Sequence, residues 1–500
     1  MRPAITSGTR SEAIGRLGSE IFDILILGGG INGAGTARDL ALRAKISGAA
    51  LRVGLVEKNH FSSGPSGKNS HLMHGGLRYL KQFDFALVKE SLHERATLLK
   101  IAPHLVEPLA FLMPIAGIGR EIFYNTGLTM YDVLAGSASL PKHRRVRLDE
   151  VRRMEPGLGL PEMTGAAEYY DAKVQSARLV LENIFEAIAH GAACANYVQA
   201  EAHAREGDAW IVQLRDRVAD RSFEARARVL VDATGPWEQN PAPRLVRGSH
   251  ILFPRLNTSD HAIAYFEESG RILFFIPWGD RTLVGTTDVD HDGSPDQVAI
   301  SADEVKYLRA QAARVFPESE TTEPVAAFSS LRPLLASSGS ATKASRDHRI
   351  YADSDGMIRI TGGKYTTYRS MSEEAADLAA PELRAVHVTA EHPLNGNSRE
   401  AVDTLMARAP ELASRHRLKT NEIETLVRGY GVMTEAVLEY LPAEAGDLSR
   451  VDAARLEFAV RHEMALRARD FLEVSTMIGF EGRRQTVAAV ERWFSENTPL

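Results

Sequence analysis

The sequence of 500 residues contains a single cysteine, Cys194. One thiol cannot form a disulfide within the chain, and it rules out a metal site built from several cysteines. Its neighbours between residues 191 and 195 are glycine and alanine, a small and apolar setting that favours a buried side chain over a reactive one. A chain without disulfides is compatible with a reducing, cytoplasmic compartment.

Long apolar runs are also missing. No stretch reaches the length of about 20 apolar residues that a membrane-spanning helix needs. The first twenty residues lack the apolar core of a secretory signal, and we expect residues 1–20 to form a polar tail. Contact with a membrane surface stays open, because a few surface residues are enough for it.

Neither an excess of basic charge nor a metal-binding pattern is present. The chain has 59 basic and 65 acidic residues and a net charge of −6, so nothing indicates nucleic acid as a partner. It contains 16 histidines, but no pair combines metal-ligand spacing with supporting acids. We therefore expect no metal.

What the sequence does contain is a nucleotide-binding pattern close to its start. The apolar run 22–27 is followed by Gly28, Gly30 and Gly33, and then by an alanine-rich helical pattern. A second apolar run ends in Glu57. Strand, tight glycine turn, helix, strand and acidic residue, in this order, predict a dinucleotide-binding unit.

Each of these residues has a physical role in that pattern. Gly28 allows the sharp turn, Gly30 removes the side chain that would block a pyrophosphate, and Gly33 lets the helix approach the sheet. The free N–H groups at the start of the helix attract the phosphates. Glu57 is placed to accept hydrogen bonds from ribose hydroxyls.

The chain is longer than one hydrophobic core usually supports, so we expect several domains. Helical periodicity marks residues 84–101 and 174–190, and short apolar segments between residues 248 and 288 alternate with turns, which indicates an antiparallel sheet. We predict a discontinuous nucleotide-binding domain within residues 21–385 (about 21–100, 170–240 and 345–385), an inserted substrate domain (about 101–169 and 241–344) and a helical cap over 386–500.

The sequence contains one complete dinucleotide-binding pattern, so a single bound dinucleotide must serve whatever reaction the chain catalyses. A second glycine fingerprint at Gly429 and Gly431 is incomplete, because Thr434 stands where the third glycine would be. Glycine-rich pieces recur far apart along the chain, at residues 74–76, 233–236 and 361–364. A domain that binds NAD would usually form one block, so a long ligand such as FAD, touched by several returning segments, explains this spread better.

Seven segments that follow one another along the chain also resemble those of a known family. They are Gly28 to Gly35, His74 to Leu80, Ala233 to Trp237, Gly248 to His250, Gly285 to Asp288, Leu331 to Pro333 and Gly362 to Arg369. Together with a weaker match after residue 461, they are similar to the FAD-dependent glycerol-3-phosphate dehydrogenases.

The resemblance implies a glucose-oxidase-like or D-amino-acid-oxidase-like FAD-binding Rossmann domain, an inserted antiparallel-sheet substrate domain and a helical C-terminal domain. It implies non-covalent FAD and oxidation of sn-glycerol 3-phosphate to dihydroxyacetone phosphate by hydride transfer from C2. It further implies quinone as the electron acceptor and peripheral attachment to the inner face of the cytoplasmic membrane. The oligomeric state stays open, with a homodimer as one option.

Five residues match positions that the resemblance assigns to the substrate pocket: Arg78, Tyr79, His250, Arg332 and Lys364. A phosphate dianion favours the planar fork of an arginine, which Arg332 supplies. A neutral imidazole can take the proton of the C2 hydroxyl, and we assign this role to His250. Lys364 either contacts substrate or lies near flavin N1. The alternatives are surface or ion-pair positions for the arginines, and a core histidine bonded to backbone for His250.

The remaining predicted site residues contact FAD. Gly28, Gly30, Gly33 and Glu57 bind its ADP half; Ser66, Ser70, Gly75 and Gly76 approach the ring or the pyrophosphate; Gly235 lies beside the adenosine; and Gly362, Gly363 and Lys364 open a late helix that faces the flavin.

The sequence departs from the family pattern at three places. Gly67 replaces a hydroxyl residue, and His71 stands where lysine or arginine is common. Residues 473–476 read Glu-Val-Ser-Thr where Arg-Arg-Thr is frequent. The segment around Gly67 is expected to line the flavin, so an altered substrate preference is an open alternative. Asp288 is either structural or functional.

Three other functions are compatible with the sequence. The first is a dehydrogenase of another polyol phosphate, such as erythritol phosphate, and the second is an oxidase that passes electrons to O₂. The third is a flavin-binding regulator without catalysis. It is disfavoured because His250, Arg332 and Lys364 are all present.

Overall fold

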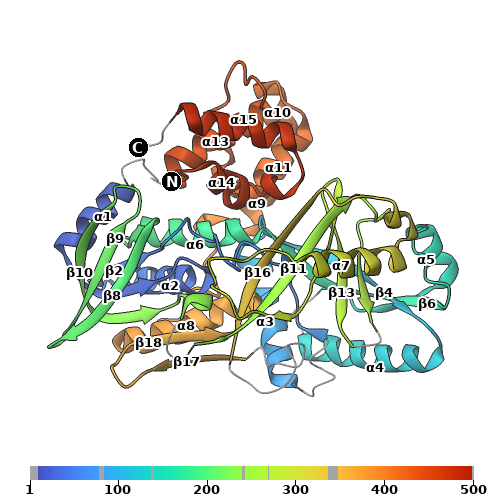
Figure 1. Cartoon of the computed structure of the whole chain (residues 1–500), viewed down its shortest axis with the longest axis horizontal. Helices are drawn as coiled ribbons and strands as arrows, with labels where there is room; N and C mark the ends of the chain where they lie inside the picture. Colours follow the sequence, from blue (N-terminus) through green and yellow to red (C-terminus); the bar gives the residue numbers. More distant parts are fainter. Residues whose placement is uncertain are drawn as a thin grey trace.

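The computed structural model describes residues 9–77, 84–136, 140–238, 242–267, 270–335 and 347–497. Two sheets lie side by side, and a helical domain formed by the end of the chain covers them in the view of Figure 1. Each sheet is assembled from segments that are far apart in the sequence.

Sheet A, on the left in Figure 1, has eight strands. They are, in order, β17 (His348–Ala352), β18 (Ile358–Gly362), β10 (Arg221–Asp232), β1 (Ile21–Leu27), β2 (Val53–Val56) and β7 (Ala193–Ala195), with β9 (Ala209–Asp216) beside β10 and β8 (Val198–Glu206) beside β9. β1 pairs in parallel with β10 and β2, and β10 pairs in parallel with β18. These strands therefore end along one edge, which is where open α/β sheets bind ligands.

Three helices pack on one another against sheet A: α2 (Ile31–Ser47), α6 (Ser176–Ala189) and α8 (Tyr368–Ala379). Figure 1 shows them in a layer beside the strands. The predicted helix over 174–190 is confirmed by α6. The same order of strand, α2 and strand was predicted from the glycine pattern, and the structure confirms it.

The prediction of a polar tail before residue 21 is wrong for the residues that the structure describes there. Residues 9–19 form helix α1 (Thr9–Ser19), which packs against β7 and β10. Ala13, Ile14 and Leu17 are buried in the core of sheet A. Their spacing places them on one helix face, which is enough apolar surface to dock a short polar helix.

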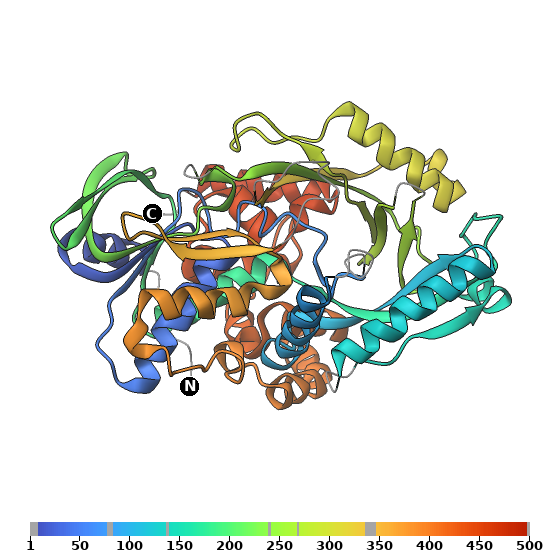
Figure 2. The ribbon, with the colours of Figure 1, turned by 90° about the horizontal axis from the view of Figure 1, so that it is seen from below.

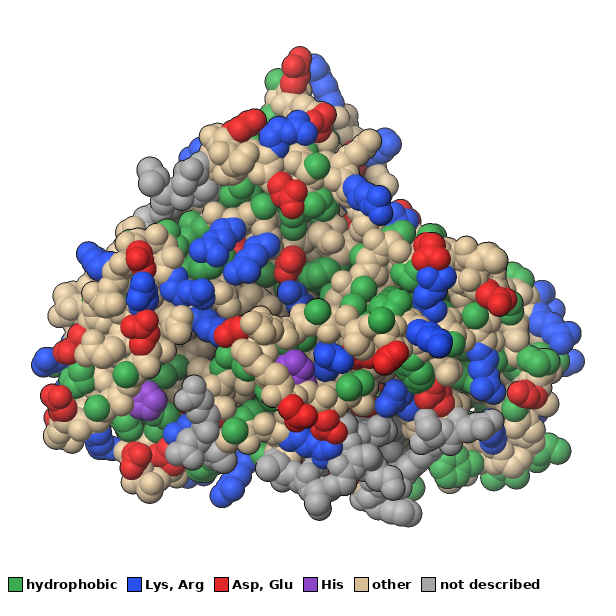
Figure 3. Space-filling view, viewed as in Figure 1, with side chains coloured by type: hydrophobic (Ala, Val, Ile, Leu, Met, Phe, Trp, Pro, Cys, Tyr) green, Lys and Arg blue, Asp and Glu red, His purple; other side chains and the backbone are tan. Residues whose placement is uncertain are grey.

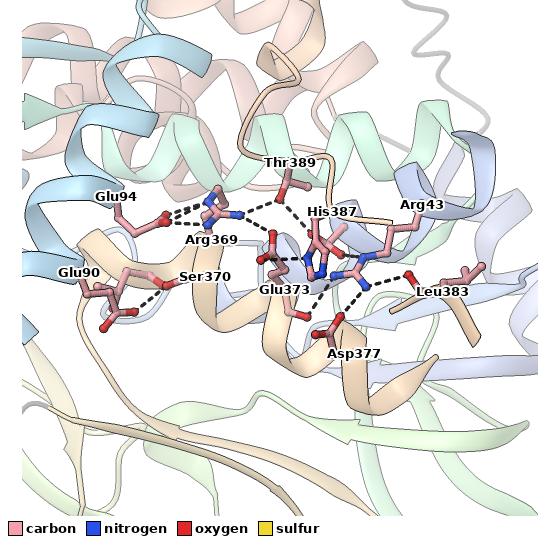
Figure 4. Close-up of polar contacts among 12 residues, drawn as sticks. Arg43, Glu90, Glu94, Arg369, Ser370, Glu373, Asp377, Leu383, His387 and Thr389 are labelled. Atoms are coloured by element: carbon pink, nitrogen blue, oxygen red, sulfur yellow. Dashed lines mark hydrogen bonds and ion pairs between the residues drawn. The ribbon is translucent and has the colours of Figure 1, made fainter. Parts of the chain in front are cut away.

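Buried ion pairs fix α8 between α2 and α3 (Phe85–Ile101), as Figure 4 shows. Arg369 in α8 donates to Glu94 in α3 at 2.6 Å, and Arg43 in α2 donates to Asp377 in α8 at 2.6 Å. Arg369 also donates to Thr389, at 3.2 Å. Because α8 follows directly after the predicted FAD-binding glycines, these pairs set the position of that segment.

Sheet B, on the right in Figure 1, has ten strands. They are β15 (Val289–Asp290), β11 (Arg244–Pro254), β14 (Arg281–Gly285), β13 (Ile272–Trp278), β12 (Ala262–Phe266), β4 (Val106–Ile115), β6 (Gly165–Val174) and β3 (Leu72–Met73), with β16 (Ala326–Leu334) beside β11 and β5 (Arg144–Arg147) beside β6. The predicted antiparallel pairing is confirmed for β11, β14, β13 and β12. β12 then pairs with β4 in parallel.

Two strands of sheet B contain residues that the sequence prediction gives to the nucleotide-binding domain. Residues 72–73, which the sequence places in the nucleotide-binding domain, form β3 and pair with β6 of sheet B. β6 itself crosses the predicted domain boundary near residue 169. A buried strand of two residues carries no periodicity of its own, so only its pairing partner identifies it.

Three helices pack against sheet B: α4 (Ile118–Ala135), α5 (Leu148–Met154) and α7 (Ala302–Val315). Leu308, Ala312 and Val315 of α7 are buried in an apolar core with the strands of this sheet. Seen from below, α4 lies alongside β4 and β6 (Figure 2). Among the described residues, no helix combines the length and the apolar character that crossing a bilayer requires.

The predicted helical C-terminal domain is confirmed. Its helices are α9 (Arg399–Ala407), α10 (Ala409–His416), α11 (Thr420–Tyr430), α12 (Thr434–Leu438), α13 (Arg450–His462), α14 (Ala468–Asp470) and α15 (Arg484–Glu496). Arg178 of α6 joins this domain to sheet A: it pairs with the fully buried Glu463 and lies 4.2 Å from the ring centre of Tyr430. A buried charge of this kind is stable only while its partner is present, so the pair fixes the helical domain in one position.

Candidate functional site

A cavity of about 560 Å³ lies between the carboxyl edge of sheet A and the strands of sheet B. Most of the predicted site residues line it: Gly28, Gly30, Glu57, Ser66, Ser70, Gly76, Gly235, His250, Arg332, Gly362, Gly363 and Lys364. Gly33 and Gly75 lie behind its wall, and Arg78 and Tyr79 fall outside the described residues. Segments from three parts of the sequence thus meet at one place.

At the sheet A end, glycines allow the chain to approach itself closely. Gly28 has a φ of +107°, and a Cβ there would lie 2.5 Å from the carbonyl oxygen of Ala233. A Cβ on Gly33 would overlap the carbonyl oxygen of Gly28. The start of α2 therefore lies directly against the ends of β1 and β10, where its free N–H groups face the cavity.

Ser66 and Glu57 complete this end. The hydroxyl of Ser66 accepts a hydrogen bond from the N–H of Ile31 at 2.9 Å. The two oxygens of Glu57 accept hydrogen bonds from the N–H groups of Gly29 and Asn59, both at 2.8 Å. Burial raises the pKa of Glu57, and these two donors oppose that rise. Each carboxylate oxygen keeps a second lone pair, which a ribose hydroxyl can use.

A clasp of three side chains closes the cavity near Glu57. Lys58 Nζ lies 2.5 Å from Asp296 Oδ1 and 4.3 Å from the ring centre of Trp237. Trp237 Nε1 donates to the same oxygen of Asp296 at 2.9 Å. All three residues line the cavity. The clasp joins sheet A, which carries Lys58, to a loop of sheet B, which carries Asp296.

At the sheet B end, His250 in β11 is buried and faces the cavity. Its Nε2 lies 2.9 Å from the hydroxyl of Ser70, and its ring stacks on Phe328 with centres 5.0 Å apart. Burial lowers the pKa of His250 well below its usual value, and the charge of Arg332 lowers it further. The imidazole is therefore neutral near pH 7 and able to accept a proton.

Arg332 lies in β16, which pairs with the strand β11 that carries His250, and its partner in the register is Val246. Its guanidinium donates to Asp288 Oδ1 at 2.7 Å, to the carbonyl oxygen of Thr287 at 3.1 Å and to the hydroxyl of Thr286 at 2.8 Å. Its side chain is 25% exposed, towards the cavity, whereas that of Asp288 is 3% exposed. Asp288, whose role the sequence left open, thus holds the arginine in place.

Lys364 lies in the turn that precedes α8, and its Nζ donates to the hydroxyl of Ser91 at 3.0 Å. The two preceding glycines have positive φ angles, +76° for Gly362 and +89° for Gly363. A Cβ on Gly363 would lie 2.5 Å from the sulfur of Met371. The turn needs glycine at both positions, and it directs Lys364 to the cavity wall.

Gly75 contacts protein groups rather than the cavity. Its N–H donates to the hydroxyl of Tyr131 at 2.7 Å and to Asp171 Oδ1 at 3.3 Å. A Cβ on Gly75 would lie 2.5 Å from the side chain of Leu92. Tyr131 belongs to α4, so the loop that leads to residue 76 is fixed from sheet B and from α4 at once.

Several residues that line the cavity were not predicted from the sequence: Tyr169, Asp171, Ile272, Phe274, Thr286 and Ser330. Tyr169 and Asp171 lie in β6, and Ile272 and Phe274 lie in β13. No motif marks any of these four, because each faces the cavity only through the pairing of its strand. Thr286 stands inside the Gly-Thr-Thr-Asp segment, which is a signal that could have identified it.

The departures from the family pattern have local explanations. A Cβ on Gly67 would overlap the carbonyl oxygen of Ser62, so this turn has no space for a larger residue. His71 lies outside the cavity, with its Nδ1 2.6 Å from the hydroxyl of Ser176, and burial lowers its pKa to about 3. Glu473 pairs with Lys68 at 2.8 Å, which joins the helical domain to the loop along the cavity.

One cluster has potential metal ligands. Ligand atoms of Glu186, His190 and His392 lie within 4.8 Å of one another. The buried guanidinium of Arg38 pairs with Glu186, and the N–H of Asn395 donates to the same carboxylate at 3.2 Å. A positive charge beside the carboxylate disfavours a cation, and we describe the cluster as part of a buried ion-pair network.

The chain is similar to known proteins over nearly its whole length. The sequence model of a family described as FAD dependent oxidoreductase matches residues 23–369, and one described as the C-terminal domain of alpha-glycerophosphate oxidase matches residues 387–496. A glycerol-3-phosphate dehydrogenase of Mycobacterium leprae is 33% identical over 96% of this chain and 85% of its own length. The aerobic glycerol-3-phosphate dehydrogenase of Escherichia coli is 33% identical over 96% of this chain and 98% of its own.

A solved structure extends the comparison to the whole fold. The glycerol-3-phosphate dehydrogenase of Bacillus halodurans, determined in complex with FAD, is similar with a TM-score of 0.81 and 26% identity, covering 98% of this chain and 94% of that one. The cavity described above fits this cofactor: it has glycines where a Cβ would collide, a helix start for the phosphates and a carboxylate for the ribose. FAD is the cofactor of the chain.

The clasp of Lys58, Trp237 and Asp296 generates a prediction about FAD retention. Replacing Asp296 by Asn removes the ion pair, and because this pair is partly exposed we expect FAD to dissociate faster by about fivefold or less. The release of flavin fluorescence on dilution measures this rate. High salt should reduce the difference, since it screens the pair in the wild-type protein. Asp292→Asn, in the same loop, is the charge-matched control, and an equal effect of both variants would contradict the clasp.

Proposed function

The chain belongs to the FAD-dependent oxidoreductase family, and from this premise we propose that it oxidises sn-glycerol 3-phosphate to dihydroxyacetone phosphate. One observation carries the proposal: a fixed arginine and a neutral, buried histidine lie on adjacent strands and face the same cavity. A phosphorylated alcohol needs both groups, one for its phosphate and one for the proton of its hydroxyl.

Arg332 binds the phosphate in this proposal. Asp288, Thr286 and the backbone of residue 287 fix the guanidinium before substrate arrives, so little conformational freedom is lost on binding. The guanidinium is partly exposed towards the cavity, where its N–H groups can bind a phosphate. Lys364 adds a second positive charge to the same cavity. We also propose that Arg78 and Tyr79, which lie outside the described residues, contact the substrate.

His250 acts as the general base. Its neutral imidazole takes the proton of the C2 hydroxyl while the hydride leaves C2, and the nearby charge of Arg332 stabilises the alkoxide character that develops. Bound FAD supplies the acceptor for that hydride. The Ser70 hydroxyl and the ring of Phe328 hold the imidazole in one orientation throughout.

The electron acceptor and a second substrate complete the proposal. We infer that quinone reoxidises the flavin, which is the acceptor that the resemblance of the sequence motifs implies. A D-erythritol 1-phosphate dehydrogenase of Brucella abortus is 36% identical over 71% of this chain and 72% of its own length. Erythritol phosphate is therefore the alternative substrate, since the same arginine would bind its phosphate.

A membrane-bound quinone requires a surface that docks on lipid, and α4 offers one. Ile118, Ile122, Phe123, Met130 and Val133 of this helix are exposed. Figure 3 shows apolar side chains gathered at the lower right of the molecule, over α4. The basic run 142–147 lies beside the helix, since its Arg145 pairs with Glu121 of α4 at 2.9 Å. We propose that this face attaches the protein peripherally to anionic lipid.

Steady-state assays with a dye acceptor test the proposed reaction. We expect the kcat/KM for sn-glycerol 3-phosphate to exceed that for D-erythritol 1-phosphate, and we expect no stoichiometric peroxide in air. A higher value for the erythritol phosphate would select the alternative substrate. Peroxide equal to the substrate consumed would select an oxidase, and a protein that retains FAD but turns over neither phosphate would contradict the proposed function.

Arg332→Met should raise KM by about 10- to 100-fold, because a charge-assisted contact to phosphate is lost. It should also change the pH profile. Since the pKa of His250 lies well below its usual value, wild-type kcat/KM falls only in acid, as the base becomes protonated. Removing the charge of Arg332 raises that pKa, so the acid limb moves to higher pH.

Two further variants control this prediction. Arg332→Lys keeps the charge, so it should leave the acid limb in place while still raising KM. Arg226→Met removes an exposed arginine and should change neither property. An unchanged KM in Arg332→Met would remove this residue from the phosphate site.

Ile122→Glu should reduce binding to vesicles that contain phosphatidylglycerol by about fivefold or more, because it places a negative charge in the apolar face of α4. Sedimentation with the vesicles measures the bound fraction. Ile46→Glu is the matched control, since Ile46 is 54% exposed on α2 and Ile122 is 63% exposed. Equal binding by both variants, or none by the wild type, would exclude this surface.

A further inference from the structure

Two glycines of sheet B lie beneath the two side chains that the proposed reaction uses. Gly248 stands in β11 and Gly285 at the end of β14. Neither has a positive φ, so a left-handed backbone is not the reason for glycine at either position. At both positions, a side chain would instead collide with a neighbouring side chain.

Gly285 is the direct cross-strand neighbour of His250. A Cβ on this glycine would lie 2.8 Å from Cγ and 2.9 Å from Nε2 of the histidine, and closer still to Cδ2. The imidazole thus rests on the bare backbone of the opposite strand. Its other face is covered by Phe328, whose ring is nearly parallel to it at an angle of 21°.

Gly248 has the same relation to Arg332. The register of β11 with β16 pairs Gly248 with Ser330, so Arg332 lies two residues further along the neighbouring strand. A Cβ on Gly248 would lie 2.6 Å, 2.7 Å and 2.8 Å from the three terminal guanidinium atoms. The planar group therefore lies flat over the glycine, with its edge held by Asp288 and Thr286.

We propose that Gly248 and Gly285 are positioning residues. The absence of a side chain at each glycine leaves the space that one functional side chain occupies: the phosphate-binding guanidinium lies over Gly248, and the general base lies over Gly285. The assignment of the two roles rests on the proposed function. Neither side chain can move away from an added Cβ without losing a contact. Arg332 would lose its hydrogen bond to Asp288, and His250 would lose its hydrogen bond to Ser70 or collide with Phe328.

The proposal predicts a division between the kinetic constants. Gly248→Ala should raise KM by about tenfold or more and change kcat by less than about threefold, because it displaces a charge-assisted contact with phosphate. Gly285→Ala should lower kcat by about 10- to 100-fold with a small change in KM, because a misplaced base loses proton-transfer efficiency. The proposal would be overturned if the two variants changed kcat and KM in the same way.

Double variants separate positioning from general damage to the sheet. If Gly285 acts through His250, the variant Gly285→Ala/His250→Ala should be no slower than His250→Ala alone. In the same way, Gly248→Ala/Arg332→Met should have no higher KM than Arg332→Met alone. Losses that multiply in the double variants would overturn the proposal. Gly15→Ala is the control, since a Cβ there meets no atom within 4 Å, and FAD content and thermal midpoint report folding in every variant.

A readout without turnover keeps this test independent of the proposed function. Inorganic phosphate can be titrated into the FAD-loaded protein and followed by flavin absorbance, where Gly248→Ala should weaken its binding by about tenfold. Crystal structures of the two alanine variants should show the imidazole and the guanidinium displaced. Side chains that stay in place, with unchanged phosphate affinity, would overturn the proposal even if the wild type proves active. A wild type inactive on both polyol phosphates would refute only the proposed reaction.

Discussion

The structure depends on how closely the start of α2 approaches the ends of β1 and β10. A Cβ on Gly28 would meet the carbonyl of Ala233, and one on Gly33 would meet the carbonyl of Gly28. Without side chains at these points, the helix start and two strand ends occupy one small volume. The carboxyl edge of sheet A is therefore open to a dinucleotide, and the segments from sheet B can close over it.

Local patterns explain which parts of the fold and site could be predicted. Gly28, Gly30 and Glu57 lie within one strand–helix–strand unit, whose order is readable from about 36 residues of sequence. Asp171 and Phe274 could not be predicted, because they reach the cavity only through strand pairing across sheet B. The role of Asp288 depends on a contact with a strand 44 residues later, and no local signal reports such a contact.

The departures from the family pattern could be explained only from contacts in the structure. Lys68 and Glu473 are separated by some four hundred residues, yet they form one ion pair between the helical domain and the cavity loop. Taken alone, Glu473 is a reversal of charge without a reason. Beside Lys68 it is the partner that a positive charge requires, and His71 is a buried neutral group among aromatic rings rather than a substitute for a cation.

The single thiol has a practical consequence. Cys194 lies in β7 beside Leu55 of β2, is fully buried, and has a pKa raised to about 12 by burial. Its side chain packs in the core with residues of α2 and α6, so a thiol reagent can reach it only when this core between sheet A and its helices opens. The rate of alkylation therefore reports the opening of the core between sheet A and the helices α2 and α6. A cysteine introduced elsewhere on the surface would accept a spectroscopic label at one position, with no native thiol to remove first.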